Sequence, residues 1–347
     1  MATPLLILLA VGGIAILLFL VIVVRMQAFI ALLLTSVLVA LLGGVEMAEI
    51  AGQIQDGMGS TLGYIAIVVG LGAMFGEMLQ VSGGATRIAR SLLRRFGEER
   101  APWGLALTGV IVATPVFFDV ALILFIPLVY SIVQRTGKSL LLYGVPLVGG
   151  IAVAHAFIPP TPGPVAVAGL LGADLGWVIV MGLVAGVPAA AIGGVLAGRR
   201  MATRIHVPVP DYMLTHGPES DEEKELPSFG LVLGIILLPL VLILLRQVAA
   251  FIGHPFMALI IATLVSFFAL GTLRGYTRDE IQRIATRAME PVGLIVLGTG
   301  AGGVFGKVLI ATGVGEALAA GMATAQMPVV LFAFLVATLL RVSQGSA

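Results

Sequence analysis

The sequence contains no cysteine among its 347 residues. This absence excludes disulfide bonds, thiolate metal ligands and cysteine nucleophiles, and it leaves the redox compartment undetermined. Charge is also scarce, because only 11% of the residues are Asp, Glu, Lys or Arg, against about 25% in a soluble domain. The formal net charge of +1 offers no basic surplus for a nucleic-acid partner.

Apolar side chains dominate instead. They make up 59% of the residues, and the mean hydropathy is +1.13. Such a chain cannot cover its surface with polar groups, which predicts an all-α polytopic protein of the lipid bilayer. The 45 glycines fit transmembrane helices that pack closely or break. The N-terminal run "MATPLLILLAVGGIAILLFLVIVV" has no basic residue ahead of it, so we interpret it as a first membrane helix rather than a cleaved signal.

Apolar runs of about 20 residues predict full-length membrane spans. These runs cover residues 4–24, 27–45, 57–80, 176–198, 229–250, 254–273 and 291–310. The one long hydrophilic stretch, 199–228, contains "HGPESDEEKELP" and is predicted to be a solvated linker.

Two further stretches predict interrupted helices. Between Arg100 and Arg135 the only charged residue is Asp119, and the stretch is too long for one span but short for two. We therefore predict a re-entrant hairpin over 101–134, lying inside protein or beside a water-filled cavity. The stretch 139–175 contains "PPTPGP", whose prolines have no N–H to donate, so this span is predicted to be broken.

The loop charges predict the orientation. Arginine gathers in four segments, while two others have acidic residues and no basic one; the basic segments are 87–100, 135–138, 199–204 and 274–287, and the acidic ones are 46–56 and 170–176. The positive-inside rule places the basic segments and the linker in the cytoplasm and the N-terminus outside. This assignment is consistent only if 101–134 returns to the cytoplasmic side.

An internal repeat relates two glycine-rich stretches. "GLGAMFGEMLQVSGG" (70–84) aligns with "GAGGVFGKVLIATGV" (300–314) at an offset of 230, with six identical positions. Each copy follows two spans and a short amphipathic segment, and the second segment carries a predicted Thr277–Glu280 capping box. The loop charges orient the copies oppositely, which predicts inverted-topology repeats over 1–198 and 229–347.

The same offset places Gln344 opposite Thr114. The terminal "RVSQGSA" is therefore expected to open a second hairpin over 327–347, in a second repeat that is truncated. On this expectation residues 1–347 alone do not transport.

Three motifs carry a resemblance to a known family: "TPVFFDVALILFIPLVY", "GIAVAHAFIPPTPGPVAVAGLLGADLG" and "RVSQGSA". With the span order, they make essentially the whole chain resemble the gluconate permease family (gluconate:proton symporters), within the wider ion-transporter superfamily. The resemblance implies proton-coupled uptake of gluconate or a related sugar or hydroxy acid across the plasma (inner) membrane. It also implies a homodimer whose broken-helix part moves like an elevator.

Asp119 is the first candidate site residue. A carboxylate in the hydrocarbon region costs about 2.5–3.5 kcal/mol on insertion scales and persists mainly beside a cavity or partner. One interpretation is a cap on the second arm of the hairpin. The other is a site role, in which Asp119 is protonated during transport, holds a sugar hydroxyl or lies away from the acid group, since an ionised Asp119 would repel an anionic substrate.

The predicted substrate-binding residues mark the helix breaks, because half-helix N-termini attract anions and hydroxyls can bind a polyol. Besides Asp119 they are Thr114, Pro115, Thr161, Gly163 and, through symmetry and the family, Gln344, Gly345 and Ser346. Each threonine could instead bond the backbone of its own helix.

The candidates for proton coupling are Asp119, His155 and Glu77. His155 titrates near physiological pH, although a packed histidine is the alternative. Glu77 aligns with Lys307 in the repeat and could pair with it or extend to the membrane surface. The sequence predicts no metal site and no cofactor.

Other functions have less support. The spans contain no H-E-x-x-H, G-x-S-x-G or paired aspartates, which argues against an intramembrane enzyme. "GTGAGG" (298–303) matches G-x-G-x-x-G but follows no strand, so a dinucleotide site is not predicted. A passive channel, or a carrier for another small organic anion, stays open; accumulation against a gradient would distinguish transport from passive flow.

Overall fold

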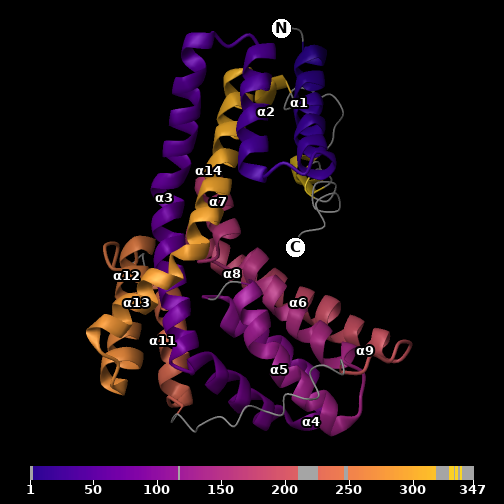
Figure 1. The fold of residues 1–347 in the computed structure, drawn as a ribbon, viewed down its shortest axis with the longest axis vertical. Helices are drawn as coiled ribbons and strands as arrows, with labels where there is room; N and C mark the ends of the chain where they lie inside the picture. Colours follow the sequence, from indigo (N-terminus) through magenta and orange to yellow (C-terminus); the bar gives the residue numbers. More distant parts are fainter. Residues whose placement is uncertain are drawn as a thin grey trace. The chain divides into compact units, whose positions relative to one another are not determined.

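A computed structural model describes residues 3–115, 118–209, 226–245, 249–317 and most of 328–337 (Figure 1). Every regular element within these segments is a helix, which agrees with the predicted all-α class. Five helices are long and apolar enough to cross a membrane: Pro4–Val23, Met47–Val81, Leu175–Ala202, Pro255–Arg274 and Arg278–Ala311. The chain divides into two compact units, Met1–Tyr64 with Gly293–Ala347, and Ile65–Val292. Each unit thus contains part of both predicted repeats.

The first unit is built around three apolar helices and the start of a fourth. They are α1 (Thr3–Leu18, continued by η1, Phe19–Val23), α2 (Ala28–Leu42), the first part of α3 (Met47–Val81) and most of α14 (Glu290–Ala311). α1 and α2 lie side by side (Figure 1). Buried Val39, Ala40, Ile50 and Val308 form one small core between α2, α3 and α14.

Glycines let α3 and α14 pack backbone to backbone within this unit. A Cβ atom added to Gly57 would lie 2.7 Å from the Cα of Val304. A Cβ on Gly300 would overlap the sulfur of Met58, and one on Gly303 would overlap the Thr61 hydroxyl. Close approach through small residues is a standard way to join membrane helices, and here it explains Gly300 and Gly303 of the second repeated stretch.

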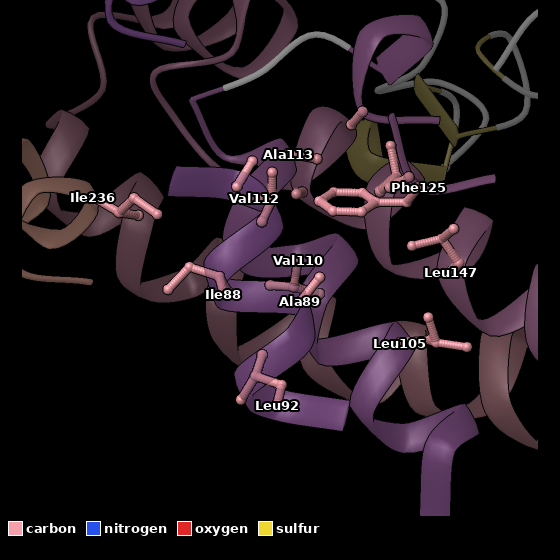
Figure 2. Close-up of a cluster of buried hydrophobic side chains, with 14 of the residues drawn as sticks. Ile88, Ala89, Leu92, Leu105, Val110, Val112, Ala113, Phe125, Leu147 and Ile236 are labelled. Atoms are coloured by element: carbon pink, nitrogen blue, oxygen red, sulfur yellow. The ribbon is translucent and has the colours of Figure 1, made fainter. Parts of the chain in front are cut away.

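The second unit holds the remaining helices. In chain order they are the rest of α3, α4 (Gly84–Ala113), α5 (Phe118–Thr136), α6 (Leu141–Phe157), α7 (Pro162–Leu171), α8 (Leu175–Ala189), η2 (Ala190–Leu196), α9 (Ala197–Ala202), α11 (Phe229–Leu244), α12 (Pro255–Ser266), η4 (Phe267–Gly271), η5 (Thr272–Arg274) and α13 (Arg278–Ala288). Figure 2 shows part of the core, where Leu105 of α4 lies on the same side as Phe125 and Leu147, while Ile236 of α11 lies on the side of Ile88.

α6 packs closely against its neighbours on two sides, through contacts at glycines. A stripe of Gly182, Gly186, Gly194 and Gly198 runs antiparallel along it; a Cβ on Gly182 would overlap the Phe157 carbonyl, and one on Gly186 would lie 2.8 Å from Val153. On the α4 side, a Cβ on Gly150 would overlap the carbonyl oxygen of Ala106. Any side chain at these glycines would push neighbouring backbone apart, so α4, α6 and α8–α9 form one closely packed body.

The capping box of the second repeat forms as expected. The Thr277 hydroxyl accepts from the Glu280 N–H, and the Glu280 carboxylate accepts from the Thr277 N–H. The helix then breaks at Met289 before α14. Pro291 explains the break, because it has no N–H for the bond to residue 287.

The first repeat differs from our expectation of a separate amphipathic segment before the span 57–80. α3 is continuous from Met47 to Val81. The position equivalent to Pro291 at the offset of 230 is Thr61, which keeps its N–H. The backbone hydrogen-bond pattern of α3 can therefore continue through this position.

Candidate functional site

The first helix break lies between α4 and α5, within the predicted hairpin. α4 is kinked at Gly97 (φ 68°, ψ 178°), so its second half starts at Glu98. Glu98 and Arg135, near the far ends of the two arms, form an ion pair with a 3.3 Å distance between Oε1 and Nη2. The chain therefore reverses direction between Ala113 and Phe118. The start of the first arm and the end of the second arm lie next to each other.

The second break lies between α6 and α7. α6 begins beside the end of α5, where the Tyr143 hydroxyl donates to the Thr136 hydroxyl at 3.3 Å. It runs to Phe157, and α7 begins at Pro162. α5 and α6 lie side by side (Figure 1), and each arm rises about 1.5 Å per residue over a similar number of residues. The two breaks therefore lie at the same end of the α4–α5–α6 bundle.

At the first break, Thr114 and Pro115 are buried. The Thr114 hydroxyl donates to the Val110 carbonyl at 2.8 Å, which is the self-bonding alternative considered for it. Asp119 is the second residue of α5, one position inside the helix rather than ahead of it. Its backbone lies in the first turn, where a negative charge is favoured by the helix dipole; its side chain lies outside the described part of the structure.

At the second break, Thr161 is the N-cap residue of α7 but its side chain does not cap the helix. Its hydroxyl donates instead to the Ile158 carbonyl at 2.7 Å. Residues 162 and 164 are prolines, so Gly163 carries the only N–H of the first three helical residues. Gly163 is exposed, and a Cβ added to it would meet no atom within 4 Å. This helix start therefore has one backbone donor in its first three residues, on an exposed glycine.

Among the remaining candidates, His155 lies beside the second break. His155 lies in the last turn of α6, two residues before its end. Glu77 is half-buried on the part of α3 in the second unit, while Lys307 is exposed on α14 in the first unit. Gln344, Gly345 and Ser346 lie outside the described residues. Within the described part of the chain, no cluster of three His, Asp or Glu residues could hold a metal ion.

Our reading of the sequence missed a hydroxyl at the base of the hairpin. Ser139 accepts from the Val207 N–H at 3.1 Å and donates to the Ile205 carbonyl at 3.0 Å. The Leu140 N–H donates to the Val207 carbonyl at 2.8 Å. The start of the predicted linker is thus attached to the α5–α6 loop rather than fully solvated. Its alternation of valine and proline, "VPVP", was the available signal for an extended segment.

Sequence comparisons identify the relatives of this chain. The model of the GntP family permeases matches residues 4–347. The chain is 40% identical over 361 residues to a low-affinity gluconate transporter of Escherichia coli strain K12, covering 100% of this chain and 80% of that protein. It is 36% identical over 370 residues to the inner membrane permease YgbN of the same strain, covering 100% and 81%.

A third relative extends the substrate range within the family. The Gnt-II system L-idonate transporter of the same strain is 35% identical over 350 residues, covering 97% of this chain and 79% of the relative. Gluconate and idonate are both sugar acids, and permeases are transporters rather than enzymes. The match over nearly the whole chain shows that this protein belongs to the GntP family of permeases.

Proposed function

We propose that the protein is a secondary active transporter that imports gluconate or a related sugar acid across the bacterial inner membrane, coupled to protons. The observation that carries this proposal is the pair of helix breaks at one end of the α4–α5–α6 bundle, in a chain of the GntP family. Broken helices inside membrane bundles are where many secondary transporters bind their substrates.

The groups at the breaks suit an acid with hydroxyls. The N–H of Gly163, an exposed residue at the start of α7, can donate to a carboxylate, aided by the helix dipole. The hydroxyl groups of Thr114 and Thr161 each donate their single proton to a nearby backbone carbonyl. Their oxygens keep free lone pairs, which can accept from substrate hydroxyls. In this proposal Pro115 shapes the first break and Asp119 approaches the substrate from the start of α5.

Asp119 is our preferred proton carrier. An ionised carboxylate beside an anionic substrate would repel it, and a proton on Asp119 removes that repulsion. Proton binding then favours substrate binding, and release of one favours release of the other, which couples the two fluxes. His155 and Glu77 are the alternative carriers, and Gln344, Gly345 and Ser346 are proposed to complete the site in the second repeat.

Two inverted repeats, 1–198 and 229–347, joined by a linker over 199–228, are proposed to support alternating access. Supporting this, α3 and α14 end in the same turn 230 residues apart. Gly83 and Gly313 both have a left-handed backbone, with φ of 74° and 76°. Each donates its N–H three residues back at 3.0 Å, to the carbonyls of Gln80 and Ile310.

The contacts of α3 and α14 also support an antiparallel relation between the copies. In the first unit, Gly300 lies against Met58 and Leu62. In the second unit, the equivalent glycine, Gly70, lies 3.4 Å (as an added Cβ) from the Met289 methyl. Position 289 corresponds to 59 at the offset of 230, the neighbour of Met58, so each glycine packs near the equivalent turn of the other copy, as expected for copies related by an approximate two-fold.

The broken-helix elements are proposed to move together against a dimeric scaffold, with the hairpin re-entrant and the N-terminus outside. The Glu98–Arg135 ion pair supports the re-entrant hairpin, because it joins the two ends that must lie on the same side. The close glycine contacts of α6 support movement as one body.

Uptake of labelled gluconate by the full-length protein in proteoliposomes tests the function. We expect accumulation above the outside concentration when the pH gradient is directed inward and little when it is collapsed. Flow that only equilibrates would favour a passive channel, and no uptake of any sugar acid would remove the proposed function. In Asp119→Asn the dependence on the pH gradient should be lost; if it is undiminished, Asp119 is not the proton carrier.

A further inference from the structure

The first half of α4 is an amphipathic helix with an unbalanced charge. Residues 84–96 contain four arginines and no acidic residue; the arginines are Arg87, Arg90, Arg94 and Arg95. The opposite face is apolar and packs into the core of the second unit through Ala85, Ile88, Ala89 and Leu92. We call the four side chains the arginine face.

The position of this helix in the chain places it at a membrane surface. It follows directly on α3, one of the helices long enough to cross a membrane, through the left-handed turn at Gly83. It ends at the kink of Gly97, after which the hairpin begins. Trp103, one turn and a half further on, is 36% exposed, and tryptophans concentrate at the headgroup level.

Three arginines of this face, Arg87, Arg94 and Arg95, can contact a partner outside the chain. Arg94 and Arg95 are exposed. The Nε of Arg87 is buried, and no acceptor among the described residues reaches it. A buried guanidinium N–H without an acceptor is costly, which points to a ligand with strong acceptor oxygens at this end of the face.

The other amphipathic helix provides a contrast. The polar face of α13 carries Asp279, Arg283 and Arg287, and Glu290 at the start of α14 lies in the same groove. These two acidic and two basic residues cancel, so this groove has no surplus of positive charge. Both helices are amphipathic, but the arginine face has a net positive charge.

We propose that the arginine face of residues 84–96 binds the phosphate headgroups of anionic phospholipids at the cytoplasmic membrane surface. Guanidinium groups bind phosphate oxygens in a planar, bidentate geometry. The apolar face packs in the protein, which leaves the charged face to attract anionic headgroups electrostatically. Bound lipid would hold the base of the hairpin at the membrane surface through Gly97.

Lipid binding by the purified full-length protein tests this proposal. Phosphatidylglycerol and phosphatidylcholine are titrated separately, and bound lipid is counted by native mass spectrometry. We expect the wild type to prefer phosphatidylglycerol, and Arg94→Gln/Arg95→Gln to lose about 30-fold in affinity for it, at about five-fold per arginine near a membrane surface. Arg87→Gln should lose at least as much as either single exposed variant.

The matched control is Arg283→Gln/Arg287→Gln on α13, which removes the same charge from a balanced face. It should keep the wild-type preference. An equal loss in both double variants, or no preference in the wild type, overturns the proposal. Displacement of the lipid by millimolar inorganic phosphate would show a site for a free anion and would also overturn it. If Arg94→Gln/Arg95→Gln does not fold by circular dichroism, the single variants Arg94→Gln and Arg95→Gln give the same comparison.

Discussion

The hydroxyls at the two helix breaks are buried and already donate to backbone carbonyls. Thr161 bonds the carbonyl of Ile158 across the break itself, so its hydroxyl both holds the break and offers its lone pairs. A substrate hydroxyl that donates to this oxygen would gain a net stabilisation of about 0.5–1.5 kcal/mol. Self-bonding and substrate binding are therefore compatible at one residue.

Replacement of Thr161 by valine separates the hydroxyl from the shape of the side chain. We expect the KM for gluconate uptake to rise about ten-fold, at about 1.4 kcal/mol for a factor of ten, because the acceptor is lost. Thr161→Ser keeps the hydroxyl and should stay within about two-fold of the wild type on the same scale. A KM unchanged in Thr161→Val would assign the hydroxyl to the backbone alone. Both variants are measured in the proteoliposome assay.

Gly97 adopts a backbone conformation that is essentially restricted to glycine. Its φ of 68° and ψ of 178° join the amphipathic helix to the hairpin, and a Cβ added there meets no atom within 4 Å. Gly97→Ala should therefore destabilise the protein by backbone strain alone, by about 1–3 kcal/mol, seen as a lower midpoint of thermal unfolding.

Gly234→Ala is the matched control for this strain. Gly234 lies within α11, also has open space at its Cβ and has no left-handed backbone. Alanine in a helix should stabilise it by about 0.5–1 kcal/mol. Equal midpoints for Gly97→Ala and Gly234→Ala would contradict the assigned conformation.

Among the elements, α6 has the closest neighbours. Its glycine pair Gly149–Gly150 faces two different helices: a Cβ on Gly149 would lie 2.7 Å from the Cα of Gly194, and one on Gly150 would overlap the Ala106 carbonyl. Both obstacles are backbone atoms, which cannot rotate away as a side chain can. α6 therefore connects the hairpin to α8–α9 as a closely packed unit.

The substitution Gly150→Ala tests this packing. One methyl group forces α4 and α6 apart, and overpacking of this kind costs about 1–3 kcal/mol. We expect a lower unfolding midpoint and reduced uptake. Gly144→Ala, on the same helix but with nothing within 4 Å of the added Cβ, should leave both unchanged or slightly improved. If Gly150→Ala leaves the unfolding midpoint and the uptake unchanged, α4 and α6 lie further apart than described above.

For the molecule as a whole, the decisive question is the path of the chain through the membrane. The absence of cysteine makes single introduced thiols specific reporters. In Glu98→Cys and in Arg135→Cys, a membrane-impermeant maleimide should react from the cytoplasmic side only, since the ion pair joins these two positions. Glu46→Cys, in the acidic segment, should react from the opposite side. Reaction of positions 98 and 135 from opposite sides would exclude the re-entrant hairpin.

The interruptions of the helices were predictable because their causes are local. A proline lacks the N–H that a helix needs, so α6 stops shortly before Pro159 and α7 starts at Pro162. The capping box of Thr277 and Glu280 was readable for the same reason. Pro291 also explains the separation of α13 from α14, although we expected the same separation in the first repeat, where Thr61 permits a continuous α3.

The geometry around the site was not predictable in the same way. The attachment of residues 205–207 to Ser139 joins groups more than 60 positions apart, and no local preference specifies such a pairing. Thr114 and Thr161 were identified from the break motifs. The residue type alone could not decide between a hydrogen bond to the local backbone and a role in substrate binding. Asp119 was placed near the start of the second arm, and α5 begins one residue before it.

By itself, the sequence determined that this is a helical membrane protein of the GntP family and that its helices break at the Thr-Pro and Pro-rich motifs. Apolar run length, missing N–H groups and family motifs are properties of short stretches, so they need no tertiary information. Only the tertiary structure decided which glycines carry the close contacts of α6 and that the ends of the hairpin meet at Glu98 and Arg135. These features depend on the distance between backbones far apart in the chain, and that distance exists only after the helices have packed.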